Sequence, residues 1–594
     1  MTRLPDGWTD AQLDARLDAL APALFRETLP EQYRPELAER YLNFGFTVIH
    51  AGTGVSSLRT QFSGPLVLLG SITGLVLLIT CANLANLLLA RASHRERELA
   101  VRLAIGASKT RLLRYSAAEA IVLALAGAVL GTGVAFGLSR FLVDALSSAN
   151  SPVYLLLEMN WTLLLFTAAT ATATALVCAI APALRATRVP PTAALRDGLR
   201  ASASSGAMSW RRVLIVGEVA LTLVLLVGAL LFARSLSNLQ RVDVGFDPAG
   251  LVEVRVELDR LPDAAARHGA VRDAMAERFA ARPWITEFAE AAYMPMGGST
   301  WNDTIDVSGL NRTDIDSQLN RVGIDYFAML GVPLLEGRRF TEQDRVDTPP
   351  VAIVNRAFRD RHLPGQSVIG RQVRFLSEPE VTYEVVGVVG DTKYANVRED
   401  DPSIIFVAAL QDPDPGTAVQ MLLRSSLEPA ATVTAVGREL SAVSPALVFR
   451  TRVLTSVIDD MLRIDRLLAA LSVAFGMLAV LLAGVGLYGV IAYIAAAREH
   501  EIGIRLALGA SRPHVVGRVV RDTAWLVAGG IALGLGGALL GARLVESLLF
   551  GLESRDPASY MAALLLLAGV GLAASVVPAW RASRTSPMKA LRQE

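Results

Sequence analysis

Few residues in this chain have the types and spacing that catalysis requires. His500 and Glu501 begin the His-Glu-x-x-His pattern that binds zinc on a helix, but Ile504 stands where the second histidine is needed. Ser586 and Lys589 have the Ser-x-x-Lys spacing of serine acyl-transfer enzymes. They fall in a tail expected on the cytoplasmic side, away from the substrate of those enzymes. We therefore expect no enzymatic activity from this chain.

Cofactor and metal sites are not predicted either. Phosphate-binding loops of ATPases need Gly-Lys-Ser/Thr, and none of the three lysines, Lys109, Lys393 and Lys589, follows a glycine. The two cysteines, Cys81 and Cys178, lie inside apolar stretches, and the six histidines are scattered. ATP hydrolysis would have to come from a partner.

The pattern that does recur is a charged segment. RERELAVRLAIGAS begins at Arg95, and REHEIGIRLALGAS begins at Arg498, 403 residues later. Each copy fits a short amphipathic helix ended by glycine. A loop or a helix at the lipid headgroups would also be rich in arginine, but topology does not explain why the order of residues repeats. We expect both copies to dock on an ATPase, through Arg95, Glu98, Arg102, Gly106 and Ser108 and through Arg498, Glu501, Arg505, Gly509 and Ser511.

A second repeated stretch closes each copy of a larger block. PALRATRVPPTAALR begins at Pro182, and PAWRASRTSPMKALR begins at Pro578. Each block contains apolar runs for three helices, one before the charged segment and two between that segment and the closing stretch. The chain therefore contains an internal duplication of a three-helix unit, as in membrane proteins with two pseudo-symmetric halves.

Composition indicates a lipid environment, because 52% of the residues are hydrophobic and only 19% are charged. A membrane-spanning helix needs about 20 apolar residues. Seven stretches are long enough, and they are Thr60–Ala90, Ala120–Ser139, Met159–Leu184, Val213–Ala233, Leu467–Ala497, Thr523–Ala542 and Pro557–Trp580.

Polar residues are sparse in these stretches. Asn83 and Asn86 lie one turn apart, and we expect them to form interhelical hydrogen bonds. The second copy has Gly486 and Gly489 at the equivalent positions, which departs from strict symmetry. We expect no ionisable residue in the middle of the helices, unlike in an ion-coupled carrier. The glycines of GGIALGLGGALLGA, from Gly529, predict close helix packing.

The distribution of arginine residues predicts the orientation of the chain in the membrane. The connecting segments 91–114, 185–212 and 498–521 are rich in arginine and are expected in the cytoplasm. Residues 235–465 then lie outside, and the C-terminus lies inside. A net charge of +1 gives no indication of a nucleic-acid partner.

Residues 235–465 have the pattern of a mixed α+β domain. LVEVRVEL from Leu251 and YEVVGVVGD from Tyr383 alternate as strands do, and AVRDAMAERFAAR from Ala270 has helical spacing. A domain of this size can form its own core.

These features resemble the FtsX-type permease domain and the periplasmic domain of the MacB-like ABC transporter permeases, in the form called duplicated orphan permeases. The resemblance rests on the repeated motifs and on YFAMLGVPLLEGRRFTEQD from Tyr326, VAIVNRAF, GQSVIGRQV and VVGVVGD. It implies a multi-pass protein of the bacterial inner membrane. It also implies the permease of an ABC-type efflux or mechanotransmission system, whose cytoplasmic ATPase moves the extracytoplasmic domain.

The cargo class implied by the resemblance is an amphiphile, peptide, antibiotic or lipoprotein, and a periplasmic adaptor is a further partner that it allows. The alternative is a non-transporting scaffold that signals to a periplasmic partner. The expected fold class is an α-helical polytopic membrane protein with an α+β extracytoplasmic domain.

The expected boundaries follow from the resemblance. They are 1–62, a remnant of a first extracytoplasmic domain; 63–197, the first FtsX-like domain; 198–210, a cytoplasmic linker; 211–236, a preceding membrane helix; 237–465, the periplasmic domain; and 466–594, the second FtsX-like domain. Because the first half lacks the helix and domain that open the second, we expect an N-terminally truncated eight-helix protein whose residues 1–62 are poorly packed.

Overall fold

The computed structural model describes residues 9–29, 35–46, 48, 57–94, 109–146, 161–186, 205–259, 263–298, 300–310, 315–413, 415–497 and 511–582. The chain forms two compact units. One consists of residues 64–241 and 462–594 and is helical, and the other consists of residues 1–63 and 242–461 and contains the sheets.

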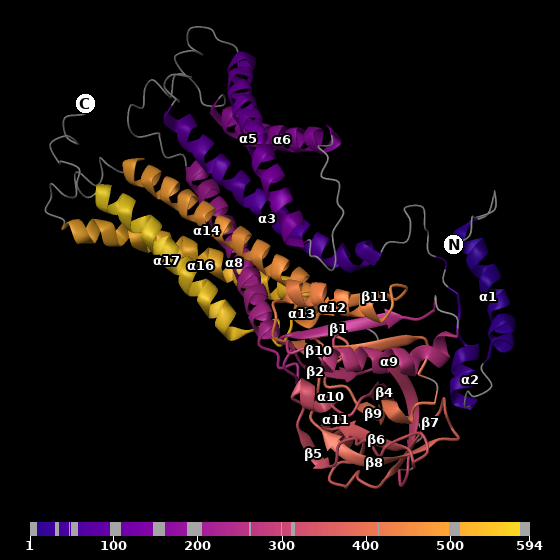
Figure 1. Cartoon of the computed structure of the whole chain (residues 1–594). Helices are drawn as coiled ribbons and strands as arrows, with labels where there is room; N and C mark the ends of the chain where they lie inside the picture. Colours follow the sequence, from indigo (N-terminus) through magenta and orange to yellow (C-terminus); the bar gives the residue numbers. More distant parts are fainter. Residues whose placement is uncertain are drawn as a thin grey trace, which may run out of the picture. The chain divides into compact units, whose positions relative to one another are not determined.

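The helical unit is built from long apolar helices (Figure 1). They are α3 (Ser57–His94), which starts in the other unit, α5 (Lys109–Leu146), α6 (Trp161–Ala186), α8 (Ser205–Gln240), α14 (Arg463–Ala497), α16 (Arg512–Val545) and α17 (Pro557–Ala582), with the short η2 (Glu546–Leu548) after α16. Every predicted apolar stretch lies mainly within one of these helices.

Six of these helices contain a span long and apolar enough to cross a membrane within the described part of the chain. The spans lie in α3, α5, α8, α14, α16 and α17. Within the described residues of α6, a shorter apolar segment covers Leu164–Thr174. Six of the predicted spans are therefore confirmed by length and composition, and the seventh stays a prediction.

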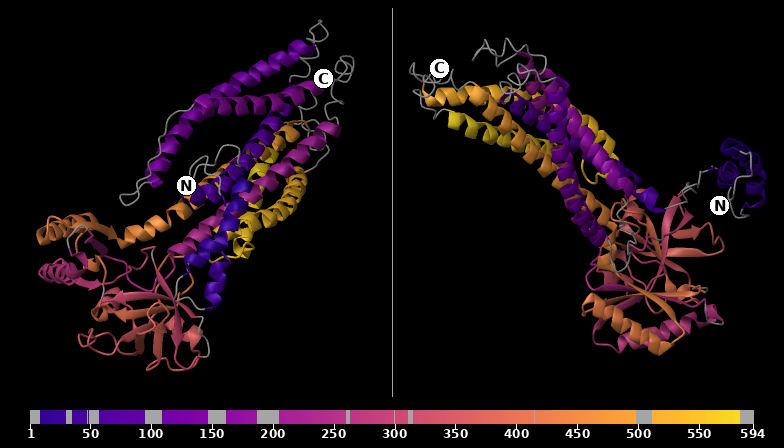
Figure 2. Two further views of the ribbon diagram at one scale, coloured as in Figure 1. Left: turned by 90° about the vertical axis from the view of Figure 1, so that its right-hand side faces the viewer. Right: turned by 90° about the horizontal axis from the view of Figure 1, so that it is seen from above.

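Helix α8 packs against the three helices of the second repeat. Its Val219 and Leu223 share a core with Leu487 of α14, Ala538 of α16 and Leu567 of α17. Helices α5 and α6 pack against each other (Figure 2). In lipid such helices associate by close packing rather than by the hydrophobic effect.

The glycines of α16 make this packing close, as the sequence predicts. A Cβ atom on Gly530 would lie 2.6 Å from the side chain of Val219, and one on Gly534 would lie 2.7 Å from the carbonyl oxygen of Ala220. Only glycine therefore permits α16 to approach α8 at these two positions.

The other unit contains an α+β domain with two sheets (Figure 1). Its strands are β1 (Leu251–Glu257), β2 (Ile285–Glu290), β3 (Trp301–Val307), β4 (Ile315–Val322), β5 (Leu334–Gly337), β6 (Val351–Asn355), β7 (Gln372–Phe375), β8 (Thr382–Val389), β9 (Ile404–Ala408), β10 (Ala418–Ser425) and β11 (Val448–Val453). Its helices are α9 (Ala264–Ala280), α10 (Tyr326–Leu330), α11 (Arg356–His362), η1 (Ala409–Gln411), α12 (Pro429–Val443) and α13 (Leu454–Met461).

The smaller sheet has the strand order β11-β1-β10-β2 and is antiparallel throughout. Helices α9 and α12 pack on it, with Phe279 and Leu440 in the same core as Val254. The predicted strand from Leu251 and the predicted helix from Ala270 are confirmed as β1 and α9. Glu253 of β1 is buried, and its carboxylate pairs with Nε of Arg452 on β11 at 2.6 Å.

The larger sheet has the order β5-β8-β6-β9-β4-β3-β7, and β7 also pairs with β8. Six of its strands therefore form a closed ring, and β5 is added at one side. The pairs β4–β9 and β6–β8 are parallel, and the other pairs are antiparallel. Ile305, Val354, Phe375 and Val385 fill the interior.

Two helices precede α3 in the chain, α1 (Asp10–Glu27) and α2 (Pro35–Leu42). The ring of Phe25 meets the rings of Tyr41, Phe44 and Phe46 with centroids 5.2 to 6.0 Å apart. Leu20, Leu24 and Phe44 remain exposed. The expectation about residues 1–62 as a domain remnant stays a prediction.

Candidate functional site

The predicted coupling residues fall almost entirely outside the described part of the chain. Those outside are Arg95, Glu98, Arg102, Gly106, Ser108, Arg498, Glu501, Arg505 and Gly509. Ser511 is described, and it is the exposed residue that precedes α16. The flanking helices are also described, because α3 ends at His94 and α5 begins at Lys109, while α14 ends at Ala497 and α16 begins at Arg512. Each copy of the segment thus joins two long helices at the same place in its repeat.

A polar cluster lies between α3, α8 and α14, inside the helical unit. Nδ2 of Asn83 donates to the carbonyl oxygen of Leu482 on α14 at 2.9 Å, which confirms the interhelical hydrogen bond predicted for this residue. Among the described residues, no hydrogen-bond partner lies within reach of either amide atom of Asn86, although this side chain is only 4% exposed. The structure thus does not show the bond predicted for Asn86.

Glu218 of α8 corrects the expectation that the helices carry no ionisable residue in their interior. It lies inside the predicted stretch Val213–Ala233 and is 1% exposed. Its carboxylate lies beside Asn83, because a Cβ atom on Gly486 would overlap Oδ1 of Asn83 and would be 2.6 and 2.7 Å from the two carboxylate oxygens. A single carboxylate in an otherwise apolar stretch could have indicated this site from sequence, since such residues in membrane helices are costly and are often functional.

A buried positive charge lies on the same helix. Arg211 of α8 is 5% exposed. Its guanidinium lies over the ring of Tyr493 on α14, 3.9 Å from the ring centroid. Arg211 and Glu218 are seven residues apart, so that they share one face of α8. The cluster therefore combines a buried guanidinium and a buried carboxyl group on one face of α8.

A small cavity of about 30 Å³ opens within this cluster. Its walls are formed by Asn83 and Asn86 of α3, Arg211 of α8, and Val485, Gly486, Gly489, Val490 and Tyr493 of α14. Gly486 and Gly489, which stand where the first copy of the repeat has Asn83 and Asn86, form part of its wall.

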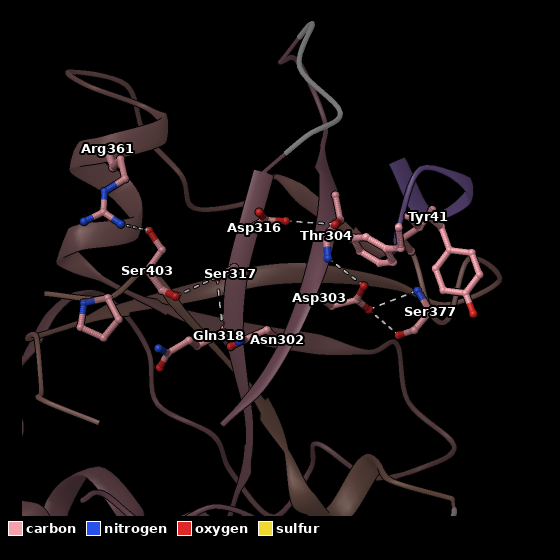
Figure 3. Close-up of a pocket in the computed structure, with 13 residues that line it drawn as sticks. Tyr41, Asn302, Asp303, Thr304, Asp316, Ser317, Gln318, Arg361, Ser377 and Ser403 are labelled. Atoms are coloured by element: carbon pink, nitrogen blue, oxygen red, sulfur yellow. Dashed lines mark hydrogen bonds between the residues drawn. The ribbon is translucent and has the colours of Figure 1, made fainter. Parts of the chain in front are cut away.

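The α+β domain has a second candidate site, a polar groove of about 670 Å³ (Figure 3). Most of its walls come from β3, β4 and the segments after β7 and before β9, with Tyr41 and Phe44 at one side. Asp303 accepts hydrogen bonds from the backbone nitrogen and the hydroxyl of Ser377, and Oγ1 of Thr304 donates to Asp316 at 3.1 Å.

The opposite side of this groove carries a cation. Nη1 of Arg361 donates to Oγ of Ser403 at 3.2 Å, and Oγ of Ser317 donates to the carbonyl oxygen of Ser403. The groove thus has carboxylates on one side and a guanidinium on the other, and its volume lies in the range of ligand-binding sites. It is suited to binding a polar ligand. In the described residues, no three His, Cys, Asp or Glu side chains could hold a metal ion together.

Two family models match the chain, and their positions follow the architecture. The FtsX-like permease C-terminal model matches twice, at residues 70–191 and 473–587. The MacB-like periplasmic core domain model matches residues 213–443. The chain belongs to the FtsX/MacB-like permeases, with the FtsX-like unit present twice around one periplasmic core domain. It is a multi-pass protein of the bacterial inner membrane, and its α+β domain is extracytoplasmic.

Curated relatives include proteins described as macrolide export ATP-binding/permease protein MacB. The one from Neisseria gonorrhoeae is 21% identical over 295 residues, which is 48% of this chain and 44% of the relative. The one from Wolinella succinogenes is 24% identical over 294 residues, and the one from an Azoarcus species is 26% identical over 302 residues. They cover 47% and 48% of this chain, respectively, and 44% of each relative. The chain therefore spans less than half the length of these relatives.

Similar solved structures include the periplasmic region of MacB from Actinobacillus actinomycetemcomitans. It is 13% identical, and the match covers 37% of this chain and 96% of that one with a TM-score of 0.27. The extracellular domain of YknZ, a noncanonic ABC-type transporter from Gram-positive bacteria, is 14% identical, with coverages of 32% and 91% and a TM-score of 0.24.

Proposed function

We propose that this permease is driven by a separate cytoplasmic ATPase, whose motions it transmits to the extracytoplasmic domain. The observation that carries the proposal is the position of the charged segment. One copy lies inside each FtsX-like match, and each copy joins two long helices. Because the same motif occurs at equivalent places in both repeats, it is suited to binding two equivalent copies of one partner.

The proposal gives one chain two docking sites, and hence two ATPase subunits for each permease chain. Helix α3 leads into the first copy of the segment, and α14 leads into the second. A tilt of either helix would be passed to α8, because α3 and α14 both pack on it. Helix α8 continues through residues 241–250 into β1 of the extracytoplasmic domain.

The proposed cargo is an amphiphile, peptide, antibiotic or lipoprotein. Support comes from the relatives described as macrolide export proteins, although the chain matches less than half of their length. The polar groove beside Asp303 and Arg361 is the proposed contact for a polar part of the cargo or for a periplasmic adaptor.

The test begins with purification of the protein from its native membranes and identification of the ATPase that accompanies it. Stimulation of that ATPase is then measured with the double variant Glu98→Lys/Glu501→Lys. We expect stimulation to be lost, because charge reversal at a docked pair leaves like charges facing each other. The matched control is Glu553→Lys, an exposed charge reversal in the loop between α16 and α17. Full stimulation by the double variant would rule out docking through these glutamates.

A further inference from the structure

The polar cluster between α3, α8 and α14 leaves several buried atoms without a hydrogen-bond partner among the described residues. They are Oδ1 of Asn83, Oδ1 and Nδ2 of Asn86, Nε of Arg211 and both carboxylate oxygens of Glu218. All four side chains are at least nine-tenths buried, with exposures of 7%, 4%, 5% and 1%. Leaving one such atom unpaired costs about 1–3 kcal/mol, and more when the group is charged. A set of six in one place points to a bound ligand.

The cavity between these atoms has the size of a water site. Its volume of about 30 Å³ exceeds the roughly 10–15 Å³ that one water molecule needs. Asn83, Asn86 and Arg211 line it directly, so donors and acceptors are both present. A metal cation is a poor occupant, because the Arg211 guanidinium already supplies a positive charge to the wall.

We propose that this cavity is a water-binding site and that its water joins Arg211 of α8 to Asn83 and Asn86 of α3. The water accepts a hydrogen bond from Nε of Arg211 and donates to the amide oxygens of Asn83 and Asn86. Asn83 also lies beside the carboxyl group of Glu218, which is not part of the cavity wall. The result is a water-mediated link between α8 and α3.

The network ties the first repeat to the second. It includes α3, which leads into the first copy of the charged segment, and α14, which leads into the second copy. A role in transmitting ATPase motion rests on the proposed function, whereas the water site itself does not.

The decisive test adds one methyl group to the cavity wall. Gly489 lines the cavity, and a Cβ atom there would have no other atom within 4 Å. Gly489→Ala therefore fits, but its methyl group displaces water. The matched control is Gly228→Ala on α8, which also has free space for a Cβ atom and lies outside the cavity wall.

We expect Gly489→Ala to lower the apparent Tm of the full chain in lipid nanodiscs, because the polar atoms lose their water. Gly228→Ala should leave the apparent Tm unchanged or raise it, because alanine favours a helix more than glycine does. If the cavity were dry, the added methyl group would fill an empty space and Gly489→Ala would raise the apparent Tm. That result would overturn the proposal.

A double-mutant cycle tests the link between Arg211 and Asn86. Arg211→Met and Asn86→Leu should each lower the apparent Tm, and the double variant should lower it by less than the sum, because each single change leaves the water without one of its partners. Additive changes would overturn the water-mediated link. An experimental density map of the full chain without a solvent peak between Arg211 and Asn86 would overturn the water site, whatever the ATPase measurements show.

Discussion

Asn83 and Gly486 occupy equivalent positions in the two copies of the repeat, and in the folded chain they lie against each other. Oδ1 of Asn83 fills the space that a Cβ atom of Gly486 would occupy. The two halves thus meet at matching positions, and the missing side chain of one copy makes room for the asparagine of the other. The two copies can make contact at these equivalent positions because one of them has glycine where the other has asparagine.

Gly486→Ala should destabilise the helical unit, because the new methyl group meets both Asn83 and Glu218. Forced overpacking of this kind costs about 1–3 kcal/mol. Thermal unfolding of the full chain in detergent measures the effect. Adding Asn83→Ala should recover part of the loss, since it removes the nearest atom. An alanine variant as stable as the wild type would show that α3 and α14 do not pack in this way.

Alanine substitutions at the glycines of α16 should lower stability by different amounts, depending on which atoms of α8 the new methyl group meets. Gly534→Ala should lower stability more than Gly530→Ala, because it meets the backbone of Ala220, whereas Gly530→Ala meets the side chain of Val219. Val219→Ala should rescue Gly530→Ala only in part, because it removes Cγ1 of Val219 but keeps the Cβ atom, which would also be 2.6 Å away.

The control in this series is Gly536→Ala, where a Cβ atom would have no atom within 4 Å. We expect it to be neutral or slightly stabilising in the same thermal unfolding measurement. Equal losses for all three α16 variants would indicate a general intolerance of alanine rather than contact with α8.

Glu290 of β2 makes the extracytoplasmic domain sensitive to pH. Burial raises the pKa of this carboxyl to about 6, and Nη1 of Arg272, 3.8 Å from the carboxylate, opposes the shift. The folded state therefore binds the proton more tightly than the unfolded state, and stability falls as pH rises from about 4.5 to about 6. At pH values above about 6, the free energy of unfolding is lower by about 2 kcal/mol than at pH values below about 4.5.

Glu290→Gln should remove this pH dependence, because glutamine stays neutral. The pH dependence of stability is measured in the full chain by hydrogen exchange of the β2 amides, corrected for intrinsic exchange rates. Glu287→Gln, a more exposed position on the same strand, is the control and should keep the dependence of the wild type. If the stability of Glu290→Gln declined with pH as that of the wild type does, the pH dependence would have to come from another group.

Single-cysteine variants test the predicted orientation, in a background without Cys81 and Cys178. Ser308→Cys places the thiol in an exposed turn of the α+β domain, and Ser583→Cys places it after α17 in the arginine-rich C-terminal segment. An impermeant thiol reagent should label only the Ser308→Cys variant in spheroplasts and both variants after lysis. Labelling of both before lysis would contradict the orientation.

The sequence by itself determined the local features of this protein. Apolar length located α3, α8 and α14, alternation located β1 and β8, and self-comparison located the repeated segments, because each of these patterns lies within one stretch of chain. Even the carboxylate of Glu218 is visible there as a charge inside an apolar run.

Tertiary structure decided which of these stretches meet. Three contacts join residues from different elements. Strand β7 pairs with β8, Gly534 packs against Ala220, and Asn83, Glu218 and Gly486 lie close together. Periodicity shows which face of an element is apolar but not which element covers it. The cavity at Gly486 and Gly489 arises because three helices leave a space that no single helix encodes.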